Sequence, residues 1–182
     1  MIVCAGNNET FSFAQPIGVG LIDSSINLTR LALFDKPEFL VFVGTAGSYG
    51  EAKIFDIRKS MTASNIELSF WQNDSYTPID NVIEAKKTTK EQTQSIIVNS
   101  SNYITTNKEL AKNYLKHNIH LENMEFFSVM RVAQEFDIPV LGIFVVTNYT
   151  DKDAHKEFLA HHDKAKKILT EYVYNKYKDL KK

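Results

Sequence analysis

Two polar residues stand out because each of them borders an apolar run. Glu125 lies within "HLENMEFFSV" (120–129), directly before two phenylalanines, and Asn148 ends "IPVLGIFVVTN" (138–148). A charged side chain is rarely buried among apolar ones without a partner, so Glu125 is expected to hold something. A carboxylate accepts hydroxyl protons well, and an asparagine amide donates and accepts hydrogen bonds at the same time. Such residues are suited to binding a small polar ligand.

Apolar runs that alternate with helical patterns must position these residues. Continuous apolar runs predict buried strands, whereas apolar residues three or four positions apart predict helices. Strands are predicted over 1–6, 16–20, 39–44, 94–101 and 138–148, with 53–64 extended, a turn over 45–50 and a polar loop over 72–92. Helices are predicted over 21–34, 106–117 and 124–137, and from residue 153 to a basic C-terminal tail.

The order of these elements predicts an α/β sandwich with a mostly parallel central sheet. In such folds, ligands bind at the carboxyl ends of the strands. Three predicted strand ends carry small or polar residues, at 44–48, 99–103 and 146–151, and Glu125 begins the helix before the last strand. We therefore expect these four segments to converge on one site.

The composition fits one soluble globular domain over residues 1–182. The chain has 43% apolar residues and a net charge of −1, which gives no general attraction to nucleic acid or to a membrane surface. We expect a cytoplasmic protein, because there is neither a signal-peptide pattern nor a segment apolar enough to span a bilayer. The single cysteine, Cys4, excludes an internal disulfide and a CxxC zinc site. The five histidines lack metal-binding spacing and are predicted to be surface residues.

Taken in order, three segments resemble the nucleoside phosphorylase superfamily, which includes purine nucleoside phosphorylases and the methylthioadenosine/adenosylhomocysteine nucleosidases. "IGVGLIDSSINLTRLALFDKPEFLVFVGTAGSYG" (17–50) is similar to the family's glycine-bounded strand, long helix, strand and Gly-Ser/Thr-Ala-Gly turn. "NMEFFSVMRVAQEFDIPVLGIFVVTN" (123–148) is similar to its Met-Glu helix and the strand that follows. "IIVNSSNYI" (96–104) lies where the family carries an aromatic residue facing the purine. The resemblance implies a three-layer α/β/α sandwich with a mostly parallel mixed sheet.

For Glu125, the resemblance implies contact with a ribose. In this family the glutamate after the methionine accepts hydrogen bonds from ribose hydroxyls, which places Met124 against the apolar face of the sugar. A negative charge there also favours an oxocarbenium-like transition state. The alternative is that Glu125 only begins a helix, where the helix dipole favours carboxylates.

For the base, the resemblance implies Asn148, Tyr103 and Ile104. Adenine-cleaving nucleosidases carry an aspartate at the position of Asn148, whereas trimeric-type purine nucleoside phosphorylases carry Thr-Asn and futalosine hydrolases tend to carry asparagine. An amide that both donates and accepts suits a 6-oxopurine, but it is not a general acid. Tyr103 would stack on the base and Ile104 would offer backbone contacts. Alternatively, Asn148 is a turn residue and Tyr103 a plain surface side chain.

For the attacking group, the resemblance leaves two routes open. Thr45, Ala46 and Gly47 match the family's small turn, whose backbone approaches sugar or phosphate. The family's phosphate-binding arginines have no counterpart here. Glu9 follows the first predicted strand, where nucleosidases keep a carboxylate that activates water. Hydrolysis therefore stays open beside phosphorolysis.

Together these expectations describe a purine nucleoside phosphorylase-like enzyme that cleaves the N-glycosidic bond of a 6-oxopurine nucleoside, with Asn148 and Glu9 as its catalytic residues. The alternatives are a nucleosidase of the futalosine or methylthioadenosine type, and a degenerate homologue that binds a nucleoside without turnover. No metal or cofactor is expected, and inorganic phosphate would be the co-substrate of phosphorolysis. The resemblance also implies a homo-oligomer built from dimers, and the balanced charge indicates no nucleic-acid or membrane partner.

Overall fold

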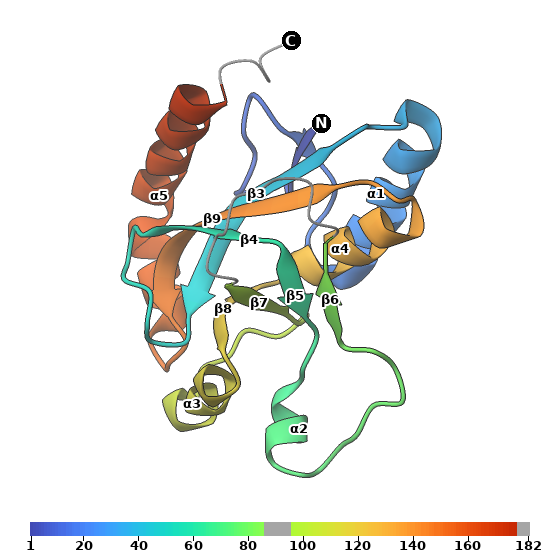
Figure 1. The fold of residues 1–182 in the computed structure, drawn as a ribbon. Helices are drawn as coiled ribbons and strands as arrows, with labels where there is room; N and C mark the ends of the chain where they lie inside the picture. Colours follow the sequence, from blue (N-terminus) through green and yellow to red (C-terminus); the bar gives the residue numbers. More distant parts are fainter. Residues whose placement is uncertain (86–95, 178–182) are drawn as a thin grey trace.

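The chain folds around a twisted central sheet that is flanked by helices (Figure 1). The computed structural model describes residues 1–85 and 96–177. In chain order, the elements of these residues are β1 (Ile2–Cys4), β2 (Gln15–Pro16), α1 (Gly20–Asp35), β3 (Leu40–Ser48), β4 (Ile57–Ser60), β5 (Thr62–Ser64), α2 (Leu68–Trp71), β6 (Val82–Glu84), β7 (Ile97–Ser100), α3 (Lys108–Lys116), β8 (Ile119–Asn123), α4 (Phe126–Glu135), β9 (Val140–Tyr149) and α5 (Ala154–Lys176).

The sheet is mixed and mostly parallel, as the sequence predicts. Its strand order is β2-β1-β3-β8-β7-β5-β6, and β9 pairs with β3 and with β4. Strands β1, β3 and β9 run parallel to one another, and their apolar runs are buried almost throughout. The antiparallel pairs are β3–β8, β4–β9 and β5–β6. Because β3 pairs with both β8 and β9 near its end, the polar residues of these three strands meet there.

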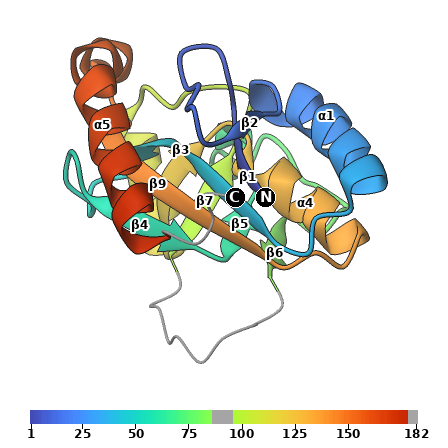
Figure 2. The same ribbon diagram turned by 90° about the horizontal axis from the view of Figure 1, so that it is seen from above.

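Helices cover both faces of the sheet, which gives the expected three layers. Figures 1 and 2 show α5 on one face and α1 with α4 on the other. Leu28 of α1 and Val129 of α4 pack with Phe42 in one core, while Leu169 of α5 packs with Val43 in the second. None of the helices in the described residues has both the length and the apolar character needed to cross a membrane.

Two central segments differ from the sequence-based expectation. The predicted turn over 45–50 is wrong for its first four residues, because β3 continues through Ser48 and pairs with β9 up to that residue. Nothing in the sequence pattern predicted β8, since apolar and polar residues alternate there over only five positions. Both strands carry residues that line the cavity, so part of the cavity wall is formed by strands and not by the expected turn.

Smaller differences lie at the edges of the fold. The strand predicted over 16–20 is reduced to β2, because the glycines that follow Pro16 adopt positive φ angles and lead into α1. Strand β6 lies inside the predicted loop over 72–92. Residues 86–92 of that loop and the basic tail from residue 178 lie outside the described residues.

The absence of a side chain at Gly142 lets two phenylalanines pack against β9. A Cβ atom at this position would lie 2.6 Å from ring atoms of both Phe126 and Phe144. The two rings meet edge to face, with centroids 5.1 Å apart. Phe126 directly follows Glu125, so this packing helps to fix the start of the helix next to the site.

We expect Gly142→Ala to lower the free energy of unfolding by about 1–3 kcal/mol, because the added methyl group must displace two buried rings. Urea denaturation followed by circular dichroism measures the change. Phe144→Leu frees part of the space, so the double variant should lose less stability than the sum of the two single variants. Strictly additive losses would contradict crowding as the cause.

Candidate active site

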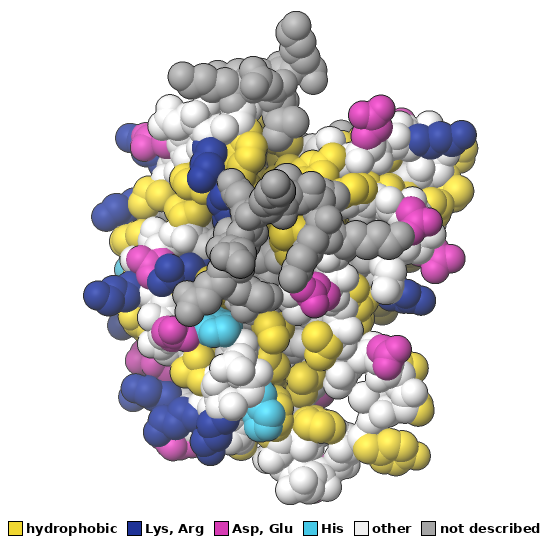
Figure 3. Space-filling model, viewed as in Figure 1, with side chains coloured by type: hydrophobic (Ala, Val, Ile, Leu, Met, Phe, Trp, Pro, Cys, Tyr) yellow, Lys and Arg dark blue, Asp and Glu magenta, His cyan; other side chains and the backbone are white. Residues whose placement is uncertain are grey.

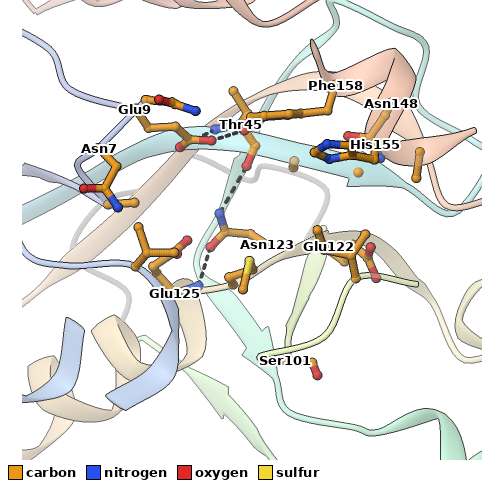
Figure 4. Close-up of a pocket in the computed structure, with 18 of the residues that line it drawn as sticks. Asn7, Glu9, Thr45, Ser101, Glu122, Asn123, Glu125, Asn148, His155 and Phe158 are labelled. Atoms are coloured by element: carbon orange, nitrogen blue, oxygen red, sulfur yellow. Dashed lines mark hydrogen bonds between the residues drawn. The ribbon is translucent and has the colours of Figure 1, made fainter. Parts of the chain in front are cut away.

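A cavity of about 310 Å³ opens where the central strands end (Figure 4). Its volume lies at the lower end of the range for small-molecule sites, which is about 300–1,000 Å³. The nine residues predicted from the sequence all line it, namely Glu9, Thr45, Ala46, Gly47, Tyr103, Ile104, Met124, Glu125 and Asn148. The four segments that were expected to converge therefore do so.

Glu125 is buried in the cavity wall and holds a neighbouring backbone group. It is 3% exposed, and its Oε1 accepts a hydrogen bond from the Gly20 N–H at 2.9 Å. Although it stands at the N-cap position of α4, its carboxylate makes no capping hydrogen bond. The Oδ1 atom of Asn123 accepts from the backbone N–H groups of Glu125 and Phe126 instead, both at 2.9 Å. Glu125 thus begins α4, as the alternative interpretation expects, and its carboxylate also lines the cavity and bonds Gly20.

Glu9 reaches the cavity from the loop after β1 and is anchored on β3. Its carboxylate accepts hydrogen bonds from the Thr45 N–H at 3.1 Å and from the Thr45 hydroxyl. Gly44 makes room for this contact, because a Cβ atom there would lie 3.1 Å from the Glu9 Oε2 atom. The backbone N–H and the hydroxyl group of Thr45, which were expected to approach a sugar or a phosphate, therefore already donate hydrogen bonds to Glu9.

The carboxyl groups of the cavity hold their protons more tightly than usual. Burial raises the pKa of Glu9, although its two hydrogen bonds with Thr45 oppose the shift. Burial, and secondly the charge of Glu9, raise the pKa of Glu125 to about 7. Burial also raises the pKa of Glu122 to about 7. Near neutral pH the three carboxyl groups are therefore not all ionised, and their total negative charge is smaller than three.

The side-chain amide of Asn148 is oriented by its two chain neighbours. The Thr147 hydroxyl donates to Oδ1 at 2.9 Å, and Nδ2 donates to the Tyr149 carbonyl at 3.1 Å. These bonds fix which end of the amide donates. An amide has a second N–H and a second oxygen lone pair, which a ligand in the cavity can use. His155, at the start of α5, lies beside Asn148 in the cavity wall (Figure 4).

Tyr103 and Ile104 form part of the cavity rim. Tyr103 is 79% exposed and Ile104 is 50% exposed. The loop that carries them is tied down on both sides, because the Tyr103 N–H donates to Ser101 Oγ and the Thr105 N–H donates to Glu122 Oε1. The ring of Tyr103 is thus available at the mouth of the cavity rather than enclosed within it.

Several lining residues escaped the sequence analysis. Asn7 comes from the short N-terminal loop, Glu122 and Asn123 from the unpredicted strand β8, and Phe158 from the first turns of α5. Glu122 stands only three residues before Glu125, so a correct strand prediction over 119–123 would have brought it to attention. Nothing in the sequence marks Asn7 or Phe158 as cavity residues.

The predicted surface position of the histidines is wrong for His162 and only partly right for His120 and His161, which are both half-buried. His162 is buried against Phe158, and His161 is half-buried with its Nδ1 atom 2.8 Å from the Thr147 carbonyl oxygen. His155 is exposed but borders the cavity. Over residues 1–85 and 96–177, no group of three or more His, Cys, Asp or Glu side chains could hold a metal ion.

A comparison of the sequence with models of known protein families shows the family of this chain. The family model of the phosphorylase superfamily matches residues 84–175, which is half of the chain. The chain belongs to the phosphorylase superfamily. The matched segment contains Tyr103, Glu125 and Asn148, so these residues come from the part of the chain that is shared with the superfamily. No curated protein matches the sequence significantly.

Solved structures share this superfamily fold at low sequence identity. An Asp-to-Asn variant of Helicobacter pylori MTAN with 5′-methylthioadenosine in its active site superimposes with a TM-score of 0.77 at 18% identity, covering 91% of this chain and 79% of that one. Native futalosine hydrolase of the same organism gives 0.74 at 20% identity, with 88% and 76% covered. Streptococcus pneumoniae MTA/SAH nucleosidase in complex with 8-aminoadenine gives 0.73 at 14% identity, with 93% and 94% covered.

We expect Glu125→Gln to stabilise the protein at pH 8 by about 1–3 kcal/mol and to have much less effect at pH 5. The folded-state pKa of about 7 exceeds the ordinary value of 4.5, so the native state binds the proton more tightly. Stability must therefore fall as the pH rises between these values, and an uncharged glutamine, which can still accept from Gly20, avoids this loss.

Urea denaturation at the two pH values measures the difference. Glu109→Gln is the control, because Glu109 is exposed and the Lys112 ammonium lowers its pKa. The control should show no gain at pH 8. An equal effect of Glu125→Gln at both pH values would contradict the raised pKa.

Proposed function

We propose that this protein is a hydrolase that cleaves the N-glycosidic bond of a purine nucleoside, with water as the nucleophile. The observation that carries the proposal is the Glu9 carboxylate, which is anchored on Thr45 inside the same cavity as Glu125. A buried carboxyl group with a raised pKa is a suitable acceptor for a proton from water. Hydrolysis is thus preferred over the phosphorolysis that the sequence first suggested.

The electrostatics of the cavity argue against a phosphate co-substrate. Glu9, Glu122 and Glu125 all line it, and the lining residues that the structure describes include neither lysine nor arginine. Arg58 pairs with Asp56, and Arg131 bonds Gln134 on the outer side of α4. A phosphate anion would meet carboxylates without the bidentate arginine partner that it prefers.

The ribose fits between Glu125 and Met124 in this proposal. The oxygen of Glu125 that does not accept from Gly20 takes the hydrogen bonds of the sugar hydroxyls, and Met124 covers the apolar side of the ring. As the glycosidic bond breaks, positive charge develops on the sugar, and an ionised carboxylate close by stabilises it. Glu9 takes one proton from the attacking water, which forms the new bond to the sugar.

The base occupies the side of the cavity that Asn148 and Tyr103 border. The fixed Asn148 amide presents one donor and one acceptor, which matches the adjacent acceptor and donor of a 6-oxopurine edge. Tyr103 stacks on the face of the base and the backbone at Ile104 contacts its edge. A futalosine hydrolase, a class that the resemblance associates with asparagine at the position of Asn148, is among the structural neighbours.

We expect the wild-type protein to release hypoxanthine from inosine at the same rate with and without inorganic phosphate. Glu9→Gln should lower kcat by about 10²–10⁴, because the base that activates water is lost. Chromatographic detection of free hypoxanthine measures both. Glu51→Gln, which removes an exposed carboxylate outside the cavity, is the matched control and should leave the rate unchanged.

Other outcomes of the same assay separate the rival functions. Release that requires phosphate would establish phosphorolysis and overturn hydrolysis. No release from inosine or methylthioadenosine, combined with a higher melting temperature in their presence, would identify a nucleoside-binding homologue without turnover.

We further propose that the protein is a homodimer in which α1 contributes to the interface. Ile22 and Ile26 are more than half exposed on the helix face opposite its buried residues, and Val19 continues this apolar face to the rim of the cavity. Figure 3 shows apolar side chains among a few charged ones at the surface on the side of α1, whereas lysine and arginine are more numerous on the side of α5. An exposed apolar face of this kind is suited to self-association.

Ile26→Lys should convert the dimer to a monomer, because it places a charge in the centre of the apolar face. Analytical ultracentrifugation measures the mass of the particle. Glu38→Lys, an exposed residue beyond the end of α1, is the control and should leave the dimer intact. A monomeric wild-type protein would overturn the proposal.

A further inference from the structure

A third carboxyl group, that of Glu122, faces the cavity from the middle of the sheet. Its backbone pairs with Gly47 of β3 on one side and with Asn99 of β7 on the other. The Tyr49 hydroxyl donates to its Oε2 atom at 3.1 Å, and the Thr105 N–H donates to its Oε1 atom at 3.0 Å. An ionisable side chain is thus held by two neutral donors at a fixed place in the cavity wall.

Glu122 lies next to Asn148, although the two residues are far apart in the sequence. Both side chains approach Gly47, since a Cβ atom there would lie 3.2 Å from the Cγ atom of Glu122 and 3.1 Å from the Nδ2 atom of Asn148. Figure 4 shows the two side chains on the same side of the cavity, with His155 close to Asn148. Glu122 therefore belongs to the part of the cavity that receives the base.

The chemistry of the proposed reaction leaves one role unfilled at this place. When the bond between the sugar and a purine breaks, the bonding electron pair goes to the base, and a proton on the purine ring neutralises that charge. The Asn148 amide cannot supply this proton, because an amide does not ionise near neutral pH. Glu9 and Glu125 face the sugar in the proposed binding mode, which leaves Glu122 beside the base.

We propose that Glu122 is the general acid that protonates the departing purine. The inference rests on the proposed hydrolase function and adds a catalytic residue to it. Burial without a neighbouring cation raises the pKa of Glu122 to about 7, so a large share of the molecules hold the proton at neutral pH. Asn148 then binds the base without transferring a proton.

In the proposed step, one proton leaves the attacking water and another is transferred to the departing base. Water forms a bond to the sugar carbon C1′ and loses one proton to Glu9, while the bond from C1′ to purine N9 breaks and its electron pair stays on the base. Glu122 gives its proton to purine N7, and the base leaves as a neutral molecule. Glu9 and Glu122 return to their starting states by exchanging protons with solvent after the products leave.

Glu122→Gln tests the proposal, because glutamine keeps the size and the hydrogen-bond acceptor but cannot donate an acidic proton. With inosine we expect kcat to fall by about 10²–10⁴. With 4-nitrophenyl β-D-ribofuranoside, whose leaving group departs as a stable anion, the rate should change by no more than about threefold. A merely structural role of Glu122 would lower both rates alike.

A second variant tests whether another carboxyl group can restore the inosine rate that Glu122→Gln loses. Asn148→Asp places a carboxyl group beside the lost one, so in the Glu122→Gln background it should recover at least about tenfold of the inosine rate. If Glu122→Gln does not fold, Glu122→Asp keeps the acid but withdraws it, and it should show the same selective loss on inosine.

The outcomes separate the two proposals. An active wild type with an unchanged inosine rate in Glu122→Gln, or with equal losses on both substrates, would overturn the role of Glu122 and leave the hydrolase function standing. A wild type that cleaves neither substrate would overturn both.

Discussion

The hydrogen bonds between Glu9 and Thr45 set the character of the whole site. They join the loop after β1 to the end of β3 and place a carboxylate on the two donors that an anionic co-substrate would otherwise use. A second carboxylate, that of Glu125, faces the same space, and burial together with Glu9 raises its pKa. This arrangement supports the proposed hydrolysis, because neighbouring carboxylates favour a developing positive charge and disfavour a phosphate anion.

The packing of the fold sustains this concentration of acidic groups. Buried carboxyl groups are unfavourable when ionised, and groups with pKa values shifted in this way are concentrated at functional sites. Hydrogen bonds from neutral donors offset this cost, because the Gly20 N–H donates to Glu125, and the Tyr49 hydroxyl and the Thr105 N–H donate to Glu122. Two glycines of β3, at positions 44 and 47, leave the space that these side chains occupy. Polar residues of the site thus depend on small residues in the most buried strand.

Prediction from the sequence succeeded where local patterns were strong. The apolar run of β9 and the helical pattern of α4 were placed within two residues of their observed ends, and they carry Asn148 and Glu125. It failed for β8, because five alternating residues give a weak signal, and for the end of β3, because Thr45 to Ser48 have the small side chains of a turn. It also could not tell that Ile22 and Ile26 face outward while Ser24 faces the core.

The sequence by itself determined the fold class from its order of apolar runs and helical patterns, and its resemblance to the superfamily pointed to nine of the residues that line the cavity. The tertiary structure alone decided how the residues act together. Glu9 meets Thr45 across 36 positions, and Glu122 meets Asn148 only because β3 lies between β8 and β9 with a glycine at the crossing point. Burial, and therefore the raised pKa values of the carboxyl groups, arises only when distant segments pack together and exclude water.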